Sequence, residues 1–167
     1  MNRWHIAQIN VGTARYALDD PGMAEFMARL NAINALADQS PGFVCRLQSD
    51  AGNATDIQAG DNTRFIVNMS VWCDAQALFD FVYKTAHRLV MAKRRQWFER
   101  PAGAYQALWW LRAGELPTVA EGLARLEHLD REGPSPFAFT FQTRFAPPDV
   151  VGPAKNMRPE PYCVGWA

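Results

Sequence analysis

Four stretches of the chain alternate apolar and polar residues, which is the period-two pattern of β-strands. They cover residues 5–11, 43–48, 63–73 and 104–111. Between them, apolar residues recur at helical spacing from Pro21 to about residue 40, and again from Asp74 to about residue 100. Thr85 is able to cap a new turn and marks a potential break in the second helical stretch. The order strand–helix–strand–strand–helix–strand predicts an α+β fold with a ferredoxin-like βαββαβ core, a four-stranded antiparallel sheet with both helices on one face.

The alternation divides the predicted sheet into two faces. The apolar face carries Ala7, Ile9, Val11, Phe65, Val67, Met69 and Val71. The mixed face combines polar and aromatic side chains, namely Trp4, Gln8, Asn10, Arg46, Gln48, Arg64, Asn68, Ser70 and Trp72. We expect the helices to leave the mixed face uncovered, as the wall of a half-buried cavity. Because an open mixed face would expose large tryptophans, we expect the sheet of a second protomer to cover it.

The last third of the chain is predicted to be an appendage to the core of residues 4–111. Thr118 and Glu121 form a capping box that starts a third helix, and Gly133 ends it. A fifth, extended strand follows, with one buried face formed by Phe137, Phe139, Phe141 and Phe145. We therefore expect one domain over residues 1–147, with residues 112–147 as the appendage and residues 148–167 as an irregular, proline-rich tail.

Charge and cysteine content narrow the classes of partner and compartment. The formal net charge of zero argues against a nucleic-acid or anionic-membrane partner, because both require an excess of Lys and Arg. No apolar run is long enough for a signal peptide or a membrane span. The odd and widely spaced Cys45, Cys73 and Cys163 indicate free thiols, so we expect a cytoplasmic protein.

His87 is the first candidate for chemistry. On a helical wheel it lies at the shoulder of the apolar stripe, near Asp80, Tyr83 and Arg94. Its imidazole is suited to act as a general base near neutral pH, oriented by Asp80 or Tyr83. A partly buried histidine that makes a local hydrogen bond is the alternative reading.

Arginines and tryptophans supply candidates for binding. Arg46 and Arg64 lie on adjacent strands of the mixed face, where they are able to bind a carboxylate or an enolate oxygen, or else form salt bridges at the rim. Trp72, Trp109 and Trp110 predict either a pocket for a flat aromatic substrate or a packed core.

Other motifs are absent or uninformative. The run Lys93-Arg94-Arg95 is most simply a solvated basic surface whose stems pack on Trp97. No pair of His or Cys residues has the spacing of a metal site, and neither a glycine-rich phosphate loop nor a nucleophile motif is present.

Several short motifs together resemble the family catalogued as domain of unknown function 3291. They are Trp72, the Phe79-x-x-x-Tyr83 stretch, His87, Arg94-Arg95-x-Trp97-Phe98, Leu108-Trp109-Trp110 and the run from Pro117 through Gly133-Pro134 to Phe141. The resemblance extends over roughly residues 4–147 and implies the dimeric α/β-barrel superfamily, hence a homodimer of two facing sheets. That superfamily includes cofactor-independent monooxygenases, haem-degrading monooxygenases and isomerases. Asn10, Trp72 and His87 match the haem-degrading branch in element and order, but the longer Trp-to-His separation and the basic segment depart from it.

The preferred hypothesis is an enzyme with a cavity between sheet and helices. Its substrate is expected to be a small aromatic or polyketide-like molecule, transformed by cofactor-independent oxygenation or proton-transfer isomerisation. His87 is the expected base, with Asn10 and Arg64 as oxyanion stabilisers; the expected binding residues are Gln8, Arg46, Asn68, Trp72, Tyr83 and Trp110. A non-catalytic module that binds a hydrophobic ligand or haem, and a dimer with a merely packed core, are the alternatives. The catalytic hypothesis requires His87 and Trp72 to line one cavity with Asn10, Asn68 or Arg64.

Overall fold

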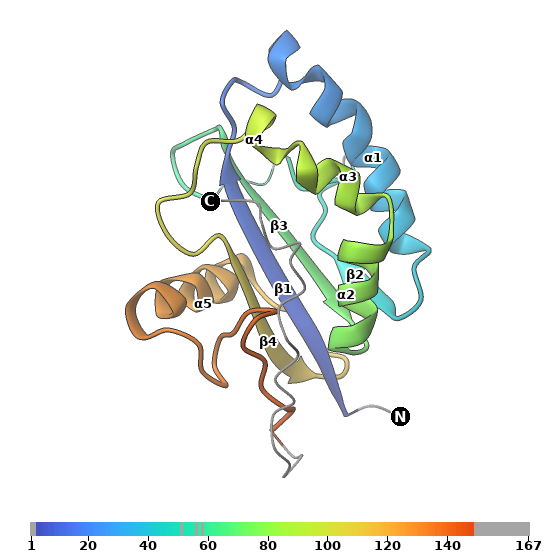
Figure 1. Cartoon of the computed structure of the whole chain (residues 1–167), viewed down its shortest axis with the longest axis vertical. Helices are drawn as coiled ribbons and strands as arrows, with labels where there is room; N and C mark the ends of the chain where they lie inside the picture. Colours follow the sequence, from blue (N-terminus) through green and yellow to red (C-terminus); the bar gives the residue numbers. More distant parts are fainter. Residues whose placement is uncertain (1–2, 51, 56, 58, 149–167) are drawn as a thin grey trace.

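The computed structural model describes residues 3–50, 52–55, 57 and 59–148 (Figure 1). Four strands form one antiparallel sheet in the order β2-β3-β1-β4. They are β1 (Trp4–Thr13), β2 (Phe43–Arg46), β3 (Phe65–Trp72) and β4 (Gln106–Arg112). This order confirms the predicted ferredoxin-like core.

The helices begin and end close to the predicted caps. They are α1 (Ala24–Asp38), α2 (Ala75–Lys84), α3 (His87–Ala92), α4 (Arg94–Trp97) and α5 (Val119–Glu132), with a single 3-10 turn η1 (Pro21–Met23) before α1. Thr85 separates α2 from α3, as its capping potential predicted. Its hydroxyl donates to the carbonyl of Phe81 at 2.5 Å and accepts from the amide of His87 at 3.2 Å. As a result, His87 is the first residue of a new helix.

Those residues of the mixed face that lie within the strands share one side of the sheet, but the prediction that the helices leave this side uncovered was wrong. In the register of β1 and β3, Asn10 is opposite Asn68 and Ile6 is opposite Trp72. Trp72 is 0% exposed within the single chain and packs against Leu78 and Phe81 of α2. A period of two fixes which residues share a face, but it does not fix which face meets the helices.

The apolar face is covered by α5. Leu126 of α5 is buried in one cluster with Ile9, Met69 and Trp109. In Figure 1, α5 and the helices α1–α3 flank the strands from opposite sides. Trp109 therefore does not share a pocket with Trp72. Because both faces of the sheet are covered within one chain, exposed tryptophans no longer argue for a second protomer.

The predicted fifth strand is reduced to a single bridge at the edge strand β4. Leu108 and Phe139 exchange two backbone hydrogen bonds of 2.8 and 2.9 Å. Backbone bonds from Ser135 to Ala138 and from Thr140 to Thr143 turn the chain on either side of the bridge, so the ladder cannot continue. Phe139 is 0% exposed, whereas Phe137 is 45% exposed, which corrects the expectation that all four phenylalanines share a buried face. Cys163 and the tail beyond residue 148 lie outside the described residues.

None of the helices in the described part of the chain has the length and apolarity needed to cross a membrane.

Candidate functional site

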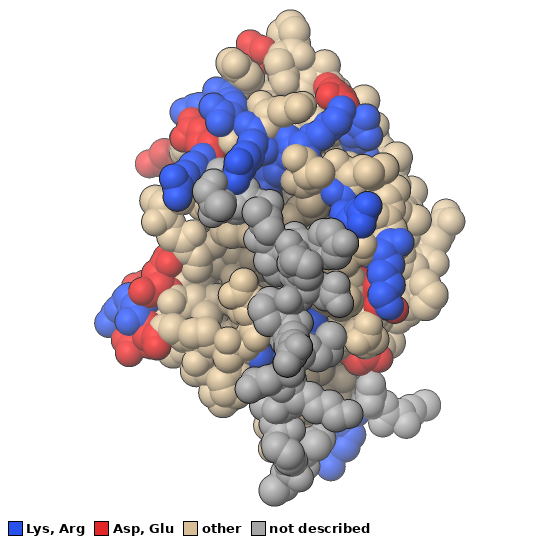
Figure 2. All heavy atoms as spheres, viewed as in Figure 1, with Lys and Arg blue, Asp and Glu red and all other residues tan. Residues whose placement is uncertain are grey.

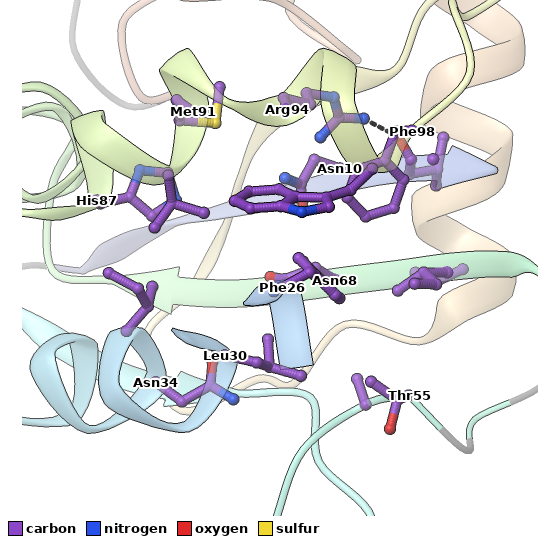
Figure 3. A pocket seen from close by; sticks show the side chains of 18 of the residues that line it. Asn10, Phe26, Leu30, Asn34, Thr55, Asn68, His87, Met91, Arg94 and Phe98 are labelled. Atoms are coloured by element: carbon purple, nitrogen blue, oxygen red, sulfur yellow. Dashed lines mark hydrogen bonds between the residues drawn. The ribbon is translucent and has the colours of Figure 1, made fainter. Parts of the chain in front are cut away.

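A cavity of about 100 Å³ lies between the mixed face of the sheet and helices α1, α3 and α4. Figure 3 shows His87, Met91 and Arg94 reaching into it from the α3–α4 region, Asn10 and Asn68 from strands β1 and β3, and Leu30 and Asn34 from α1. A second cavity of about 50 Å³ adjoins the first. The residues that line both are Asn10, Ile33, Asn34, Asn68, His87 and Met91. The two cavities therefore adjoin one another, and most of the residues that they share are polar.

His87 enters this region as a neutral imidazole. Its Nδ1 lies 3.4 Å from the carbonyl oxygen of Val82, and a hydrogen bond there requires the proton on Nδ1 and leaves Nε2 as an acceptor. Burial lowers the pKa of His87 from 6.5 to about 4; the Val82 bond opposes this shift, and the positive charge of Arg94 adds to it. At neutral pH the ring is therefore uncharged, and its free nitrogen is able to accept a proton.

Three asparagines place amide groups around the histidine. Asn10 and Asn68 lie opposite one another on paired strands, and Asn34 faces the same two cavities from α1. The Oδ1 atom of Asn10 is buried and has no hydrogen-bond partner among the described residues. Buried acceptors are almost always paired, so this oxygen is a candidate partner for a donor of a ligand in the cavity that Asn10 lines. Asn34 was not among the predicted site residues, although a polar residue within the apolar stripe of a helix is a signal that could have identified it.

Arg94 places a positive charge in the larger cavity. Its Nη2 donates to the carbonyl of Val11 at 2.6 Å, and its guanidinium lies about as far from the ring of Phe98 (5.0 Å) as from that of Tyr105 (5.1 Å). Gly12 makes this position available, because a Cβ there would lie 2.9 Å from Nη2 of Arg94. Burial lowers the pKa of Arg94, yet an arginine stays charged at neutral pH. The interpretation of Arg94 as part of a solvated surface is therefore corrected.

Comparison with known proteins supplies a family. The family model described as domain of unknown function (DUF3291) matches residues 5–154. The chain belongs to the DUF3291 family. No curated protein matches its sequence at a significant level.

Solved structures similar to this DUF3291 protein share little sequence with it. A protein of unknown function from Nitrosomonas europaea is 14% identical, with a TM-score of 0.44, over 71% of this chain and 99% of that one. SnoaB, a cofactor-independent oxygenase from Streptomyces nogalater, is 18% identical, with a TM-score of 0.43, over 67% of this chain and 95% of its own. A protein from Pseudomonas aeruginosa is 18% identical, with a TM-score of 0.44, over 70% and 99%.

Two of the predicted binding residues of this DUF3291 chain border only the smaller cavity and are already engaged. Trp72 donates from Nε1 to the hydroxyl of Ser70 at 2.9 Å and stacks on Phe81, so most of its surface is core. Arg46 forms a two-point ion pair with Asp38, at 2.8 and 3.1 Å. Arg46 therefore forms a salt bridge, which was the alternative to binding a carboxylate or an enolate oxygen of a ligand. Gln8 is buried on the same side of the sheet and also lines this cavity.

Arg64 lies away from both cavities. It directly precedes β3, and its guanidinium binds the carbonyl of Ala14 at 2.9 Å and Glu99 at 3.0 Å. The predicted strand began at Thr63, but the strand begins at Phe65. Arg64 consequently turns to the rim instead of joining the mixed face.

Tyr83 and Trp110 also lie outside the lining of the two cavities. Tyr83 packs on Phe79 and Phe141, because the break after α2 separates it from His87. Trp110 donates to the carbonyl of Phe145 at 2.8 Å. Asp80 bonds to Gln76 and Lys84 on its own helix. Neither Asp80 nor Tyr83 is therefore placed to orient His87, a task that the Val82 carbonyl takes instead.

The geometric requirement for a base at His87 is met by the smaller cavity. Its lining includes His87, Trp72, Asn10 and Asn68. The side chains together offer a neutral proton acceptor, amide donors and acceptors, and apolar walls. Where this cavity joins the larger one, such a group of residues is able to face a small ring and to accept a proton from it.

Haem does not fit these residues. The larger cavity encloses about 100 Å³, whereas pockets for drug-sized ligands enclose roughly 300–1,000 Å³. Trp72, the counterpart suggested by the haem-degrading branch, is sealed between the sheet and Phe81. The haem-binding alternative is therefore set aside.

Proposed function

We propose that this protein is an enzyme that binds a small cyclic substrate between its sheet and helices, and that His87 removes a proton from that substrate. The observation that carries the proposal is the convergence of an unprotonated imidazole with the side chains of Asn10 and Asn68 on one cavity. A general base has to come within about 2.6–3.2 Å of the proton it removes, or act through one water. The common lining of His87 and the two asparagines supports such an approach to a ring held in this space.

In the proposed reaction, Nε2 of His87 takes a proton from an acidic O–H or C–H of the ring. The electron pair stays on the substrate as an enolate, and hydrogen bonds from the amides of Asn10 and Asn68 stabilise the developing charge. In the same step, the negative charge that develops on the substrate raises the pKa of His87. This rise compensates for the low pKa of His87 in the free protein. Return of the proton to another carbon completes an isomerisation. Alternatively, the enolate reacts with dioxygen to form a C–O bond and a peroxide anion, which takes the proton back from the imidazolium. Loss of water from this hydroperoxide, with the remaining hydrogen of the same carbon, breaks the O–O bond, leaves a carbonyl on the ring and completes a cofactor-independent oxygenation.

The size of the cavity limits the substrate. An apolar cavity of roughly 150 Å³ takes up benzene, and the two adjoining cavities here enclose about 100 and 50 Å³. We therefore propose a single-ring compound, which narrows the original expectation of an aromatic or polyketide-like substrate. Phe26, Leu30 and Phe98 form the apolar part of the wall.

A binding module without chemistry is the second candidate. The low pKa of His87, about 4, favours this candidate, since a general base is most effective when its pKa lies near the working pH. Under this candidate, the hydrogen bond to Val82 is a structural contact and the cavity only holds its ligand.

Hydrogen exchange distinguishes the two candidates. The protein is incubated in D₂O with resorcinol, hydroquinone or cyclohexane-1,3-dione, while loss of C–H signals is followed by NMR and oxygen uptake by an electrode. His87→Asn is the matched variant, because its amide is still able to donate to the Val82 carbonyl. We expect wild-type protein to accelerate exchange or oxygen uptake, and the variant to lose roughly 10²–10⁴-fold of that acceleration. Saturable binding without acceleration in the wild type would favour the binding module.

A further inference from the structure

The positive charge of Arg94 is not neutralised by any carboxylate of the described residues. Nearby acidic groups are already taken: Glu25 pairs with Arg29 and Lys93, both at 2.8 Å, and Glu99 pairs with Arg64 at 3.0 Å. Arg94 receives one backbone carbonyl and two aromatic faces. Aromatic faces attract a cation more weakly than a carboxylate does. Within the described residues, Arg94 is therefore a largely buried cation without a carboxylate partner.

Part of the hydrogen-bonding capacity of Arg94 is also unused. Its Nε atom is buried and has no partner in the part of the chain that the structure describes, although Nη2 donates to the carbonyl of Val11. Removing a guanidinium from water is unfavourable unless its donors are satisfied, so an unfilled donor beside a cavity is an attractive position for an anion. The unpaired acceptor Oδ1 of Asn10 lies in the lining of the same cavity. Each atom is covered by its neighbours, and both belong to residues that line the same cavity.

The surroundings of this cavity favour anions over cations. Residues 88–100 contain Arg88, Lys93, Arg94, Arg95 and Arg100, against the single acid Glu99. Figure 2 shows Lys and Arg side chains gathered in the upper part of the molecule, where Figure 1 places α4. A surface of one sign raises the local concentration of ligands of the other sign. Since the whole chain has a net charge of zero, this concentration of positive charge is a local feature.

We infer that the ligand of this cavity is a single-ring monoanion, a carboxylate or an ionised phenol or enol, whose charged oxygen pairs with the guanidinium of Arg94. The inference deepens the proposed function, because it concerns the same cavity and gives the substrate a charge. It does not depend on catalysis by His87. The ring lies against the apolar wall, and a hydroxyl of the ligand is available to donate to Oδ1 of Asn10.

Pairs of charged and neutral ring compounds test the inference in the whole protein. Benzoate is compared with benzamide, and 4-nitrophenolate with 4-nitroanisole, by calorimetric or NMR titration at a pH where each acid is ionised. We expect at least one anion to bind tenfold or more tightly than its neutral partner. Preference in the first pair indicates a carboxylate ligand, and preference in the second a phenolate. No preference in either pair, or no binding at millimolar concentration, overturns the inference.

Variants assign the preference to Arg94. Arg94→Gln is expected to bring the affinity ratio of anion to neutral compound close to one, whereas Arg95→Gln, an equal loss of charge at an exposed neighbour, retains it. Arg94→Lys keeps the charge without the fork of donors and is expected to retain part of the preference, which protects the test if the glutamine variant fails to fold. A preference that survives in Arg94→Gln overturns the inference. His87→Asn separates the two proposals, since it should abolish proton exchange yet retain the preference for the anion.

Discussion

A Cβ atom placed on Gly122 would lie 2.6 Å from the Cδ1 atom of Ile9. Real Cβ atoms do not approach so closely, so the absence of a side chain at Gly122 is what allows α5 to lie directly against β1. The same glycine faces the sulfur of Met69 on β3. This contact lets a helix from the last third of the chain seal the face of the sheet that α1–α4 leave open.

Gly122→Ala should destabilise the protein even though alanine favours a helix. The helical preference is worth up to about 1 kcal/mol, whereas overpacking in a tight core typically costs about 1–3 kcal/mol. We expect a net loss in the free energy of unfolding, measured by urea denaturation. Ile9→Val removes the clashing Cδ1, so the double variant should recover most of the loss caused by Gly122→Ala. Equal effects of Gly122→Ala in the two backgrounds would show that this contact does not limit the approach of α5.

Phe139 and Phe137 provide a matched pair for the edge segment. Phe139 is fully buried beside Trp110 and Phe145, whereas Phe137 is 45% exposed and lies under the guanidinium of Arg125. Phe139→Ala should lower the free energy of unfolding by about 3–5 kcal/mol. Phe137→Ala should cost no more than about 1 kcal/mol. Similar losses for both, in parallel denaturation curves, would mean that the bridge to β4 does not anchor this segment.

Homodimerisation stays a prediction, now supported by the family resemblance and no longer by exposed tryptophans. Light scattering at micromolar concentration is expected to give twice the chain mass of 18.8 kDa. Because α5 covers the apolar face of the sheet, the interface of a dimer has to include α5 at that face or lie on another surface. A single-chain mass that does not change with concentration would refute the dimer without affecting the cavity.

Local sequence rules predicted the elements well. Thr118 caps α5 as expected, and Asp20 and Asp74 cap η1 and α2, each through a side-chain oxygen that accepts a hydrogen bond from a backbone amide. Thr85 breaks the second helix, and this break brings His87 to a helix start at the cavity. These features depend on residues a few positions apart, which is why a single sequence reveals them.

The arrangement of the site was less predictable because it depends on contacts between distant segments. Alternation correctly grouped Asn10 with Asn68, but both faces of the sheet are covered, so the pattern did not reveal which one the helices meet. The helical wheel placed Arg94 near His87, seven residues and two helical turns away. The run of basic residues around Arg94 nevertheless led to its interpretation as part of a solvated surface. The carboxylates that bind Arg46 and Arg64 lie elsewhere in the sequence, and no local pattern identifies them.

The pH dependence of stability offers a direct test of the environment of His87. Its pKa is about 4 in the folded protein and 6.5 when exposed, so between these values the unfolded chain binds more protons than the folded one. The contribution of His87 to the free energy of unfolding should therefore be constant above about pH 6.5. It should decrease as the pH is lowered towards 4 and change no further below pH 4. A shift of this size corresponds to an upper limit of about 3 kcal/mol.

His87→Asn isolates that contribution, because an asparagine does not titrate in this range. Glu25, whose pKa is lowered by hydrogen bonds from Lys93 and Arg29, loses stabilising interactions at acid pH in both proteins, so its effect cancels in the difference. Urea denaturation of both proteins at steps from pH 7.5 to 4 gives the difference in free energy of unfolding. That difference should become steadily smaller below about pH 6.5. The reason is that the contribution of His87 to stability decreases with pH, whereas asparagine at this position makes no pH-dependent contribution. Parallel curves over the whole range would mean that His87 is solvated, which would also remove the basis for a neutral imidazole in the cavity.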